Sequence, residues 1–159
     1  MIEIKNVSLN EVEFYNKIRN NYENYFLLNY GSFKIEKKNI TKMWITKNKK
    51  NLWSIYYKRE IVGYIKLASF SPGEAFSYYK EVGIFIDENY RGLGIGKKSL
   101  KKLLRLDKYN FYIARVSESN YGSKKLFKSA GFKSLGKINV LRKATKRKEK
   151  LFFFVLDNQ

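Results

Sequence analysis

One stretch, residues 81–104, constrains the fold of this 159-residue chain more than any other. It begins with Glu81 and a short run of apolar, mostly β-branched and aromatic residues that ends at Ile86. Such a run predicts a strand that is buried on both faces. After a polar break, three glycines stand at alternate positions, and leucines recur at helical spacing from Leu93 to Leu104 with lysines between them. The sequence therefore predicts a strand, a glycine loop and a basic helix in succession.

The glycine loop, Arg91 to Gly96, is suited to hold a phosphate group. Its glycines leave the backbone amides uncovered by side chains, and the helix that follows adds the positive end of its dipole. Two common phosphate loops do not fit. A nucleotide-triphosphate loop requires Gly where Arg91 stands, and Ser or Thr where Lys98 stands. A dinucleotide loop requires a third Gly at the position of Lys97 and an acidic residue near Arg115.

Two motifs in the chain resemble those of one protein family. The loop fits the pattern Arg-x-x-Gly-x-Gly, formed by Arg91, Gly94 and Gly96 directly after the predicted strand. At these residues the chain resembles the GNAT superfamily of acyl-CoA-dependent N-acetyltransferases, whose signature loop wraps the pyrophosphate of the coenzyme. The segment from Asn120 to Phe132 resembles the Asn-x-x-Ala-x-x-Leu-Tyr-x-x-x-Gly-Phe helix of the same family.

The resemblance implies the GNAT fold, a mixed α+β (α/β) domain with a central mixed sheet of six to seven strands flanked by about four helices. We expect a single domain over residues 1–159. Outside the two motifs, periodicity and turn residues predict a strand at 2–7, a helix at 8–20 behind a capping box, a helix at 36–47, a hairpin of 52–57 with 61–70, a strand at 111–116, and a closing hairpin of 132–141 with 150–156. In the second of these helices, Ile40, Met43 and Trp44 are expected to face the core.

The resemblance also implies acetyl-CoA as co-substrate. The residues that it places at the coenzyme are Phe85, Ile86, Arg91, Gly92, Leu93, Gly94, Ile95, Gly96, Lys97, Asn120, Ser123 and Phe127. Backbone amides at Phe85 and Ile86 would bind the oxyanion and the pantetheine amides, where the neighbouring strand splays away, and Asn120 would bond the pantetheine arm. Gly83, inside the strand, indicates either a bulge or close backbone approach, or a packing role.

Transfer by direct attack of an amine needs a proton acceptor, because an alkyl ammonium has a pKa near 10.4. Glu81 resembles the general base of many GNAT enzymes; the alternative is a carboxylate paired with Lys80 or another lysine. The family's usual general acid is a Tyr at the position of Phe127, and Phe cannot donate a proton. Either Tyr121 or another of the 13 tyrosines replaces it, or the thiolate leaves unassisted, since a thiol pKa near 8.5 makes a fair leaving group.

Two segments are candidates for contacts with the acceptor. In GNAT folds the connection after the first helix borders the acceptor pocket. The resemblance therefore implies substrate contacts at Arg19, Asn20, Tyr22 and Asn24. The alternative is that this segment is an ordinary surface loop. The basic run 142–148 is either a solvated hairpin tip or a phosphate contact for a nucleotide-linked acceptor. It has no aromatic residues between its charges, so we do not expect a nucleic-acid partner.

The composition excludes several reaction classes. The chain has no Cys and no His, which rules out cysteine nucleophiles, Ser-His-Asp triads and His/Cys zinc sites, and we expect no metal. Its net charge of +19 attracts anions, although the abundance of Lys and Asn is also a general compositional bias. The charge favours a nucleotide-linked amino sugar or another small anionic amine as the acceptor. Alternatives are a protein N-terminal (ribosomal-protein-type) or polyamine acetyltransferase, a non-catalytic acyl-CoA-binding module, and a basic RNA-binding domain.

No segment reads as a membrane span or a secretion signal. The longest apolar run, Leu151 to Leu156, is far shorter than the roughly 20 residues that cross a bilayer. The sequence therefore predicts a cytoplasmic protein without a membrane partner, and it leaves a homodimer open.

Overall fold

The structure is a computed structural model, and it describes residues 1–21, 35–69, 79–107, 109, 111–142 and 147–157. Within these ranges the chain forms a seven-stranded mixed sheet of order β1-β2-β3-β4-β5-β7-β6. The strands are β1 (Ile2–Asn6), β2 (Leu52–Tyr57), β3 (Glu60–Ser69), β4 (Tyr79–Ile86), β5 (Phe111–Ser117), β6 (Lys133–Arg142) and β7 (Arg147–Asp157). Neighbouring strands are antiparallel except for β4 and β5, which are parallel. The predicted fold class is confirmed.

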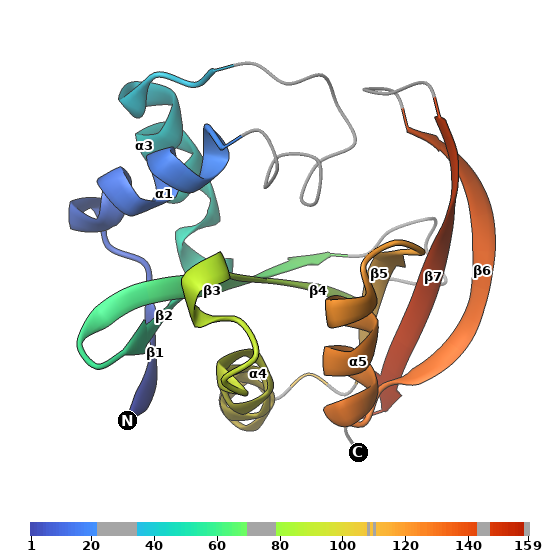
Figure 1. Ribbon diagram of the computed structural model, residues 1–159. Coiled ribbons are helices and arrows are strands. Elements are labelled where there is room, and N and C mark those ends of the chain that lie inside the picture. Colours follow the sequence, from blue (N-terminus) through green and yellow to red (C-terminus); the bar gives the residue numbers. More distant parts are fainter. Residues whose placement is uncertain (22–34, 70–78, 108, 110, 143–146, 158–159) are drawn as a thin grey trace.

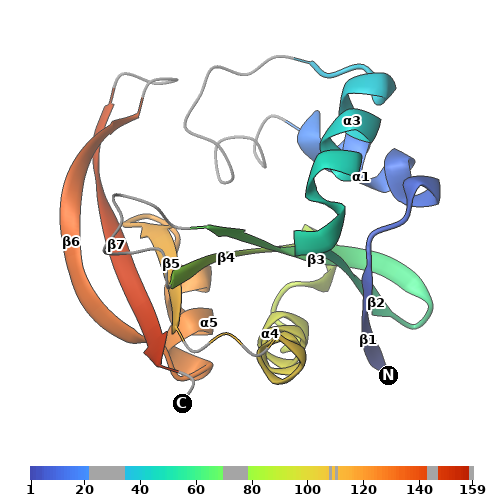
Figure 2. The same ribbon diagram turned by 180° about the vertical axis from the view of Figure 1, so that it is seen from behind.

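Helices cover both faces of this sheet (Figure 1). Four α-helices lie in the described ranges: α1 (Val12–Arg19), α3 (Lys38–Asn48), α4 (Ile95–Leu106) and α5 (Tyr121–Ser129). Helices α1 and α3 lie on the upper face as drawn, and α4 and α5 lie on the lower face. Figures 1 and 2 agree that the long β6–β7 hairpin bends upward, opposite α1 and α3, so that the upper face lies between these helices and the hairpin. None of these helices is long and apolar enough to cross a membrane.

Each face has its own apolar core because alternate strand residues point to opposite sides. The lower core is the larger one, and it includes Ile65 and Val82 of the sheet with Leu100 and Leu103 of α4. The upper core joins α1 and α3 to the sheet through Tyr15, Ile45, Tyr64 and Phe85. The alternation fixes the face of each strand residue: Val82 points down, whereas Phe85 points up.

The predicted capping box is confirmed, and it leads into the first helix. The Ser8 amide donates to the Glu11 carboxylate over 3.0 Å, and one 3-10 turn precedes α1. The Glu11 carboxylate is buried and also accepts hydrogen bonds from Ser54 (2.6 Å) and Tyr56 of β2. This network ties the start of α1 to the sheet, because an unpaired buried carboxylate would be costly.

The predicted inward face of α3 is wrong for Ile40 and Met43 and confirmed for Trp44. Ile40 and Met43 are 45% and 67% exposed, whereas Thr41 and Ile45 are fully buried. Trp44 is partly buried and packs against the upper core. The physical reason is a polar contact: Asn16 of α1 donates to Thr41 Oγ1 over 2.8 Å, which lets a small polar residue take the inward position.

The basic helix also begins later than its leucine pattern predicts. Gly94 is its N-cap residue, and α4 starts at Ile95. Leu93 therefore lies in the loop, 57% exposed, and the buried stripe is completed instead by Ile95. The other predicted elements are confirmed, with two differences at their starts: β7 begins three residues earlier than predicted, at Arg147, and the first helix opens with the 3-10 turn before α1. The turn at 71–74 lies outside the described residues.

Candidate active site

The sheet opens between β4 and β5. These two parallel strands pair only over Tyr79–Glu81 with Phe111–Ile113. Beyond this point β5 continues to pair with β7, while residues 82–86 of β4 pair with β3 alone. The two strands therefore diverge into a wedge, as the resemblance implied. A strand edge of this kind leaves backbone donors and acceptors unpaired in the middle of a sheet.

The pairing of β4 with β3 fixes which amides face the wedge. The Asp87 amide donates to Val62 of β3 over 2.8 Å. Because backbone groups alternate along a strand, the amide of Phe85 is also directed toward β3, and the amide of Ile86 is directed toward the wedge. The backbone amides of Val82 and Ile84 point in the same direction as the amide of Ile86. The expected amide donor at Ile86 fits this geometry. Phe85 does not fit that role, and its ring instead stacks on Tyr64 in the upper core, with ring centroids 5.6 Å apart.

The glycine loop follows the end of β4, on the open side of the wedge. Gly92 and Gly94 have φ values of +79° and +72°, in the left-handed region that favours glycine. No atom outside their chain neighbours lies within 4 Å of where their Cβ atoms would be, so conformation rather than crowding requires glycine at both positions. Arg91 precedes them and donates from Nε to the Ile86 carbonyl over 2.9 Å. The loop is thus tied to the end of β4, with backbone amides at the start of α4.

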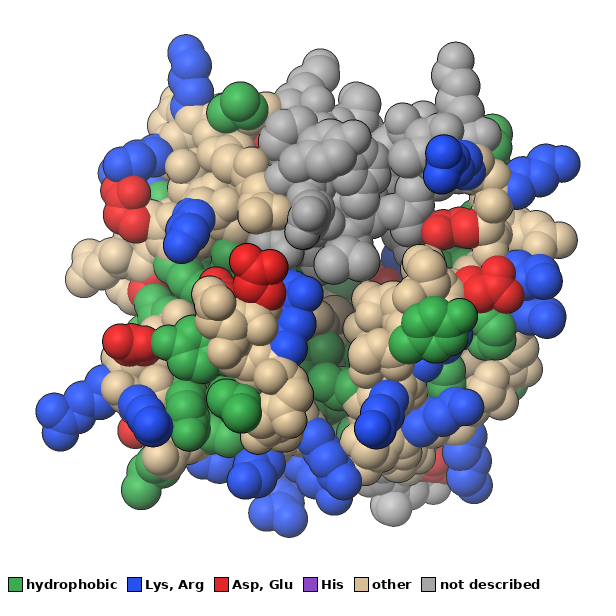
Figure 3. All heavy atoms as spheres, in the orientation of Figure 1, with side chains coloured by type: hydrophobic (Ala, Val, Ile, Leu, Met, Phe, Trp, Pro, Cys, Tyr) green, Lys and Arg blue, Asp and Glu red, His purple; other side chains and the backbone are tan. Residues whose placement is uncertain are grey.

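Gly96 serves a different purpose from the other two glycines. It is buried in the first turn of α4, and a Cβ there would lie 2.6 Å from Leu126 Cδ1 of α5. The glycine therefore allows close approach of α4 and α5, the two helices that carry the two sequence motifs. Lys97, the next residue, is exposed. Figure 3 shows the surface hollowed between the loop region and α5, with Lys and Arg side chains along the hollow.

The second motif helix is capped by its Asn and buries its aromatic residue. Asn120 caps α5, accepting from the Ser123 amide over 3.1 Å through Oδ1. Phe127 is 3% exposed and packs against Phe132 and Phe154, with ring centroids 5.1 and 6.5 Å apart. Phe127 therefore occupies the expected tyrosine position as a core residue without a hydroxyl group.

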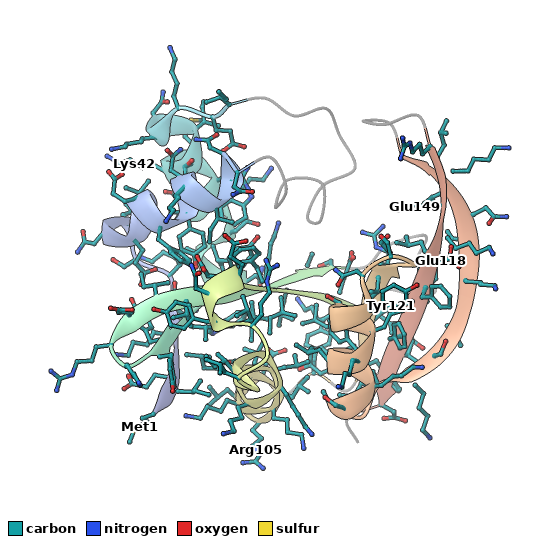
Figure 4. The ribbon with its side chains drawn as sticks, viewed as in Figure 1. Met1, Lys42, Arg105, Glu118, Tyr121 and Glu149 are labelled. Atoms are coloured by element: carbon teal, nitrogen blue, oxygen red, sulfur yellow. The ribbon has the colours of Figure 1, made fainter. Side chains whose placement is uncertain are left out.

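Tyr121 does not join this core. Its side chain is 74% exposed (Figure 4), and its ring lies 4.2 Å from Lys124 Nζ. With Lys128, Phe152 and other residues it lines a separate groove of about 660 Å³ between α5 and the β6–β7 hairpin. The structure does not bring Tyr121 together with the wedge, so it does not support Tyr121 as the acid that protonates the thiolate.

Glu81 stands where pairing between β4 and β5 ends, on the upper face. Its carboxylate accepts two hydrogen bonds from Arg115 of β5, Nε to Oε1 at 2.6 Å and a terminal nitrogen to Oε2 at 2.8 Å. The Glu81 side chain is 22% exposed and that of Arg115 is 38% exposed, so the pair is reached by solvent. The partner is thus an arginine on the neighbouring strand, and neither Lys80 nor another lysine forms an ion pair with Glu81 among the described residues.

The acceptor contacts expected after the first helix divide into three groups. Arg19 donates to both carboxylate oxygens of Glu36, at 2.8 and 2.5 Å, and its guanidinium lies 4.3 Å from the Trp44 ring. Asn20 pairs with the backbone of Glu36, accepting its amide at 2.6 Å and donating to its carbonyl at 2.9 Å. Tyr22 and Asn24 lie outside the described residues. Arg19 and Asn20 thus hold α1 to the segment that precedes α3.

Lys66 is a site residue that the sequence reasoning missed. It lies on the upper face of β3, partly buried, with Nζ 5.4 Å from the Trp44 ring. Burial lowers the pKa of Lys66, and Arg19 and Lys47 lower it further, while Glu81 acts in the opposite direction. Burial also raises the pKa of the neighbouring Tyr64 to about 12. Alternation along 61–70 was the available signal, because it places Lys66 on the same face as Tyr64.

The described part of the hairpin tip is exposed. Arg147 and Lys148 are exposed at the start of β7, and residues 143–146 of the basic run lie outside the described ranges. Close to this tip, Ser117 of β5 donates to Glu149 of β7 over 2.9 Å. This contact holds the tip half of the hairpin against β5, the strand that borders the wedge.

Comparison with known proteins identifies the family. The model of the acetyltransferase (GNAT) family matches residues 14–132. A search of curated proteins finds no match.

Solved structures of similar fold include several acetyltransferases. An N-acetyltransferase from Staphylococcus aureus Mu50 has a TM-score of 0.83 at 22% identity, with 100% of this chain and 99% of that chain covered. A ribosomal-protein-alanine N-acetyltransferase from Brucella melitensis has a TM-score of 0.84 at 22% identity, covering 98% and 99%. A GNAT superfamily phosphinothricin acetyltransferase from Sinorhizobium meliloti, in complex with AcCoA, has a TM-score of 0.82 at 17% identity, covering 98% and 88%. At these levels of sequence identity, the similarity to solved structures shows the fold alone. The family match spans both motifs and most of the sequence, and it shows that this chain belongs to the acetyltransferase (GNAT) family.

Proposed function

We propose that this protein transfers an acetyl group from acetyl-CoA to a primary amine on a small anionic molecule. One observation carries the proposal: the wedge between β4 and β5 lies directly beside a glycine loop at the start of a helix. This arrangement offers backbone amides both to a thioester and to a diphosphate. The family match and the acetyl-CoA present in a neighbour of the same fold support the choice of cofactor.

The chain's own groups fit the coenzyme. The amides of 92–97, at the positive end of the α4 dipole, would hold the pyrophosphate, and Arg91 would add a cation beside it. The wedge-facing amide of Ile86 would donate to the pantetheine arm or to the oxyanion. Asn120 has its Oδ1 engaged in the helix cap, so its side-chain amide nitrogen is the group that would bind the arm. Leu93 and Ile95 would contribute through their backbones, because one side chain is exposed and the other is buried in the core.

The proposed reaction is direct transfer. The neutral amine attacks the thioester carbon, the carbonyl oxygen takes up the charge, and the C–S bond breaks as the amide forms. Glu81 receives the proton from the amine, directly or through water. Its two oxygens offer about four acceptor positions, and Arg115 engages two of them, so the carboxylate retains capacity to accept a further hydrogen bond.

The departing thiolate has no tyrosine donor at the expected position. Phe127 cannot protonate it, and Tyr121 lines the separate groove beside the β6–β7 hairpin. A thiol pKa of about 8.5 lets the thiolate leave without assistance. General acid assistance is typically worth about 10² to 10⁴ in rate, so we expect a slow enzyme.

An anionic acceptor is favoured by the charge of the chain and by the cations near the wedge. The net charge is +19, and Lys66, Arg115 and Arg19 all belong to the upper face or its border. A nucleotide-linked amino sugar is the acceptor class that we put first. A protein N-terminus is the alternative, since the Brucella melitensis neighbour is named for such an activity.

The experiment that tests the proposal is a thiol-release assay with acetyl-CoA over a panel of amines: amino-sugar phosphates, nucleotide-linked amino sugars, short peptides and polyamines. Amine-dependent release that is fastest with anionic amines supports the proposal. Peptides that react while every anionic small molecule fails would contradict the acceptor class.

A non-catalytic coenzyme-binding module is the second candidate, and Phe127 favours it. That candidate predicts tight acetyl-CoA binding by calorimetry with no amine-dependent thiol release. The two readouts together therefore separate an enzyme from a binding module.

A further inference from the structure

Gly83 stands in the middle of β4, at a position where neither backbone conformation nor packing requires glycine. Its φ does not lie in the left-handed region, because it is absent from the positive-φ glycines of the described residues. A Cβ at Gly83 would meet nothing closer than the Lys66 carbonyl oxygen at 4.0 Å. The register between β3 and β4 runs through Gly83 without a bulge, which removes one of the alternatives that the sequence left open. Glycine weakens a strand interior, and here no feature of the fold explains it.

The neighbouring Gly63 shows what a glycine required by packing looks like. A Cβ at Gly63 would lie 2.2 Å from the Phe85 carbonyl oxygen. No side chain can occupy that position without moving β4. Gly83 has no such neighbour, and it is exposed on the upper face. The missing side chain therefore leaves space above the sheet, at the mouth of the wedge.

Two cations flank this space. Lys66 pairs directly with Gly83 across the β3–β4 ladder. On the other side of Gly83, Glu81 of β4 pairs with Ile113 of β5. Gly83 lies two residues after Glu81, and Arg115 lies two residues after Ile113, so Gly83 and Arg115 stand at corresponding positions of the two strands. The hydrogen bonds from Arg115 to Glu81 place both side chains on the same face. Strands lie about 4.8 Å apart, so the backbones of Lys66 and Arg115 are about 10 Å apart or more, with only Gly83 between them.

Lys66 is the less explained of the two cations. Arg115 has Glu81, whereas no carboxylate of the described residues lies within 4 Å of Lys66 Nζ. Its environment is partly buried and includes a second cation, Arg19, and both of these lower its pKa, whereas the more distant Glu81 carboxylate acts in the opposite direction. Glu81 is already paired with Arg115, and a partly buried ammonium group without an ion pair of its own is stabilised when a ligand supplies an anion.

We propose that the space over Gly83, between Lys66 and Arg115, holds the acidic group of the acceptor, a phosphate or a carboxylate. The inference rests on the proposed transferase function and deepens it. Lys66 and Arg115 would neutralise the acid, Gly83 would make room for it, and the amine would then extend toward the opening between β4 and β5. Lys66 and Gly83 are thus specificity-determining residues, separate from the acetyl-CoA loop.

The test uses pairs of amines that differ only in their acidic group. Glucosamine 6-phosphate against glucosamine tests a phosphate, and alanine against alaninamide tests a carboxylate. For the parent protein we expect at least tenfold higher kcat/KM for the acidic member of one pair, and the pair that shows it identifies the acid. Equal kcat/KM within both pairs would overturn the inference.

Variants then locate the effect. Lys66→Met should reduce kcat/KM for the preferred acidic amine at least tenfold, leaving the neutral member and the Kd for acetyl-CoA within twofold. Lys42→Met removes the same charge from the outer side of α3 (Figure 4) and should leave both amines unchanged. A loss shared by Lys42→Met, or one equal for acidic and neutral amines, would assign the effect to overall charge and contradict a site at Lys66.

Gly83→Ala and Gly83→Val test the space itself. Both variants should melt at or above the parent's temperature, because the strand gains a side chain that fits. The acceptor KM should rise at least tenfold with valine and less with alanine, at unchanged Kd for acetyl-CoA. A stable Gly83→Val protein with the parent's acceptor KM would show that nothing occupies the space.

One further readout does not depend on turnover, so it separates this inference from the proposed function. Lys66 is acetylated chemically with an N-hydroxysuccinimide ester, and its modified fraction is measured by mass spectrometry. In one of the two pairs, the acidic amine (glucosamine 6-phosphate or alanine) should protect Lys66 at least threefold more than its neutral partner does, with Lys42 unprotected. Protection of Lys66 without any amine-dependent thiol release would support the anion site and contradict the transferase function. Thiol release without protection would support the transferase function and overturn the anion site.

Discussion

Glu81 and Arg115 are joined by two hydrogen bonds, of 2.6 and 2.8 Å, at the point where the parallel strands β4 and β5 separate. A bidentate pair of this kind fixes the carboxylate plane as well as its position. The proposed base is therefore held in one orientation at the mouth of the wedge. Both side chains remain in contact with solvent, which offers a path for the proton to leave.

We expect Glu81→Gln to lower kcat/KM for amine acetylation by about 10² to 10⁴, the usual contribution of a general base. The amide is nearly isosteric but accepts a proton poorly. Acetyl-CoA-dependent thiol release at fixed amine concentration measures the loss, with calorimetry confirming unchanged acetyl-CoA binding. Activity within twofold of the parent would show that water or another group takes the proton.

Replacement of Arg91 should weaken acetyl-CoA binding selectively. Arg91 stands at the start of the glycine loop, and a hydrogen bond to a charged group is worth about 1.5 to 3 kcal/mol, so Arg91→Ala should raise the Kd at least tenfold. Arg105→Ala is the matched control. It removes the same charge from the last turn of α4, about 15 Å along the helix axis from the first turn. Equal weakening by the two variants, measured by calorimetry, would mean that net charge alone attracts the coenzyme.

The close approach at Gly63 predicts a stability loss that Gly83 does not share. A Cβ at Gly63 would lie 2.2 Å from the Phe85 carbonyl oxygen, so Gly63→Ala should reduce the free energy of unfolding by about 1 to 3 kcal/mol. Urea denaturation followed by tryptophan fluorescence measures the change, and Gly83→Ala is the control. If both variants were equally stable, β4 would be able to shift away from β3 at no cost.

Lys66 should make stability depend on pH in the alkaline range. Burial lowers its pKa in the folded protein, and Arg19 from α1 and Lys47 from α3 add to this, while Glu81 from β4 opposes it. The unfolded chain restores the ordinary value of about 10.4. Folding therefore disfavours the charged form of Lys66, which lowers the free energy of unfolding. This loss of stability is fully present below the folded-state pKa and disappears as the pH rises toward 10.4.

The Lys66→Met variant tests this sign. It should melt at a higher temperature than the parent at pH 7, and the difference should shrink as pH rises through the lowered pKa. Differential scanning calorimetry between pH 7 and pH 10.5 measures it, with Lys42→Met as the control that shows no trend. A difference that grows with pH would contradict the assigned direction.

The sequence was sufficient for the parts of the fold that depend on local patterns. The capping box at Ser8 and Glu11, the glycine turn before α4 and the β2–β3 hairpin follow from short-range chemistry, and all three are present. The inward face of α3 was not predictable in this way. Its buried Thr41 depends on Asn16, 25 residues away, and periodicity carries no information about such a partner.

The site was predictable where it depends on the loop, and not where it depends on neighbouring strands. The glycine positions in the sequence predicted the loop between β4 and α4. The pairing of Glu81 with Arg115 could not be predicted in this way, because it depends on the β4–β5 register. Likewise, Lys66 and Gly83 are 17 residues apart, and only the β3–β4 ladder makes them neighbours. Tyr121 lines a groove beside the hairpin instead of taking the place of Phe127, a position that its adjacency to Asn120 does not reveal.

The contact between Gly96 and Leu126 couples the packing of the two motifs. A chimera that grafts a coenzyme loop with alanine at position 96 onto this scaffold would place the new Cβ 2.6 Å from Leu126 Cδ1, so the Leu126 side chain would have to move. Position 126 is therefore the place on α5 to vary together with position 96 when such loops are exchanged.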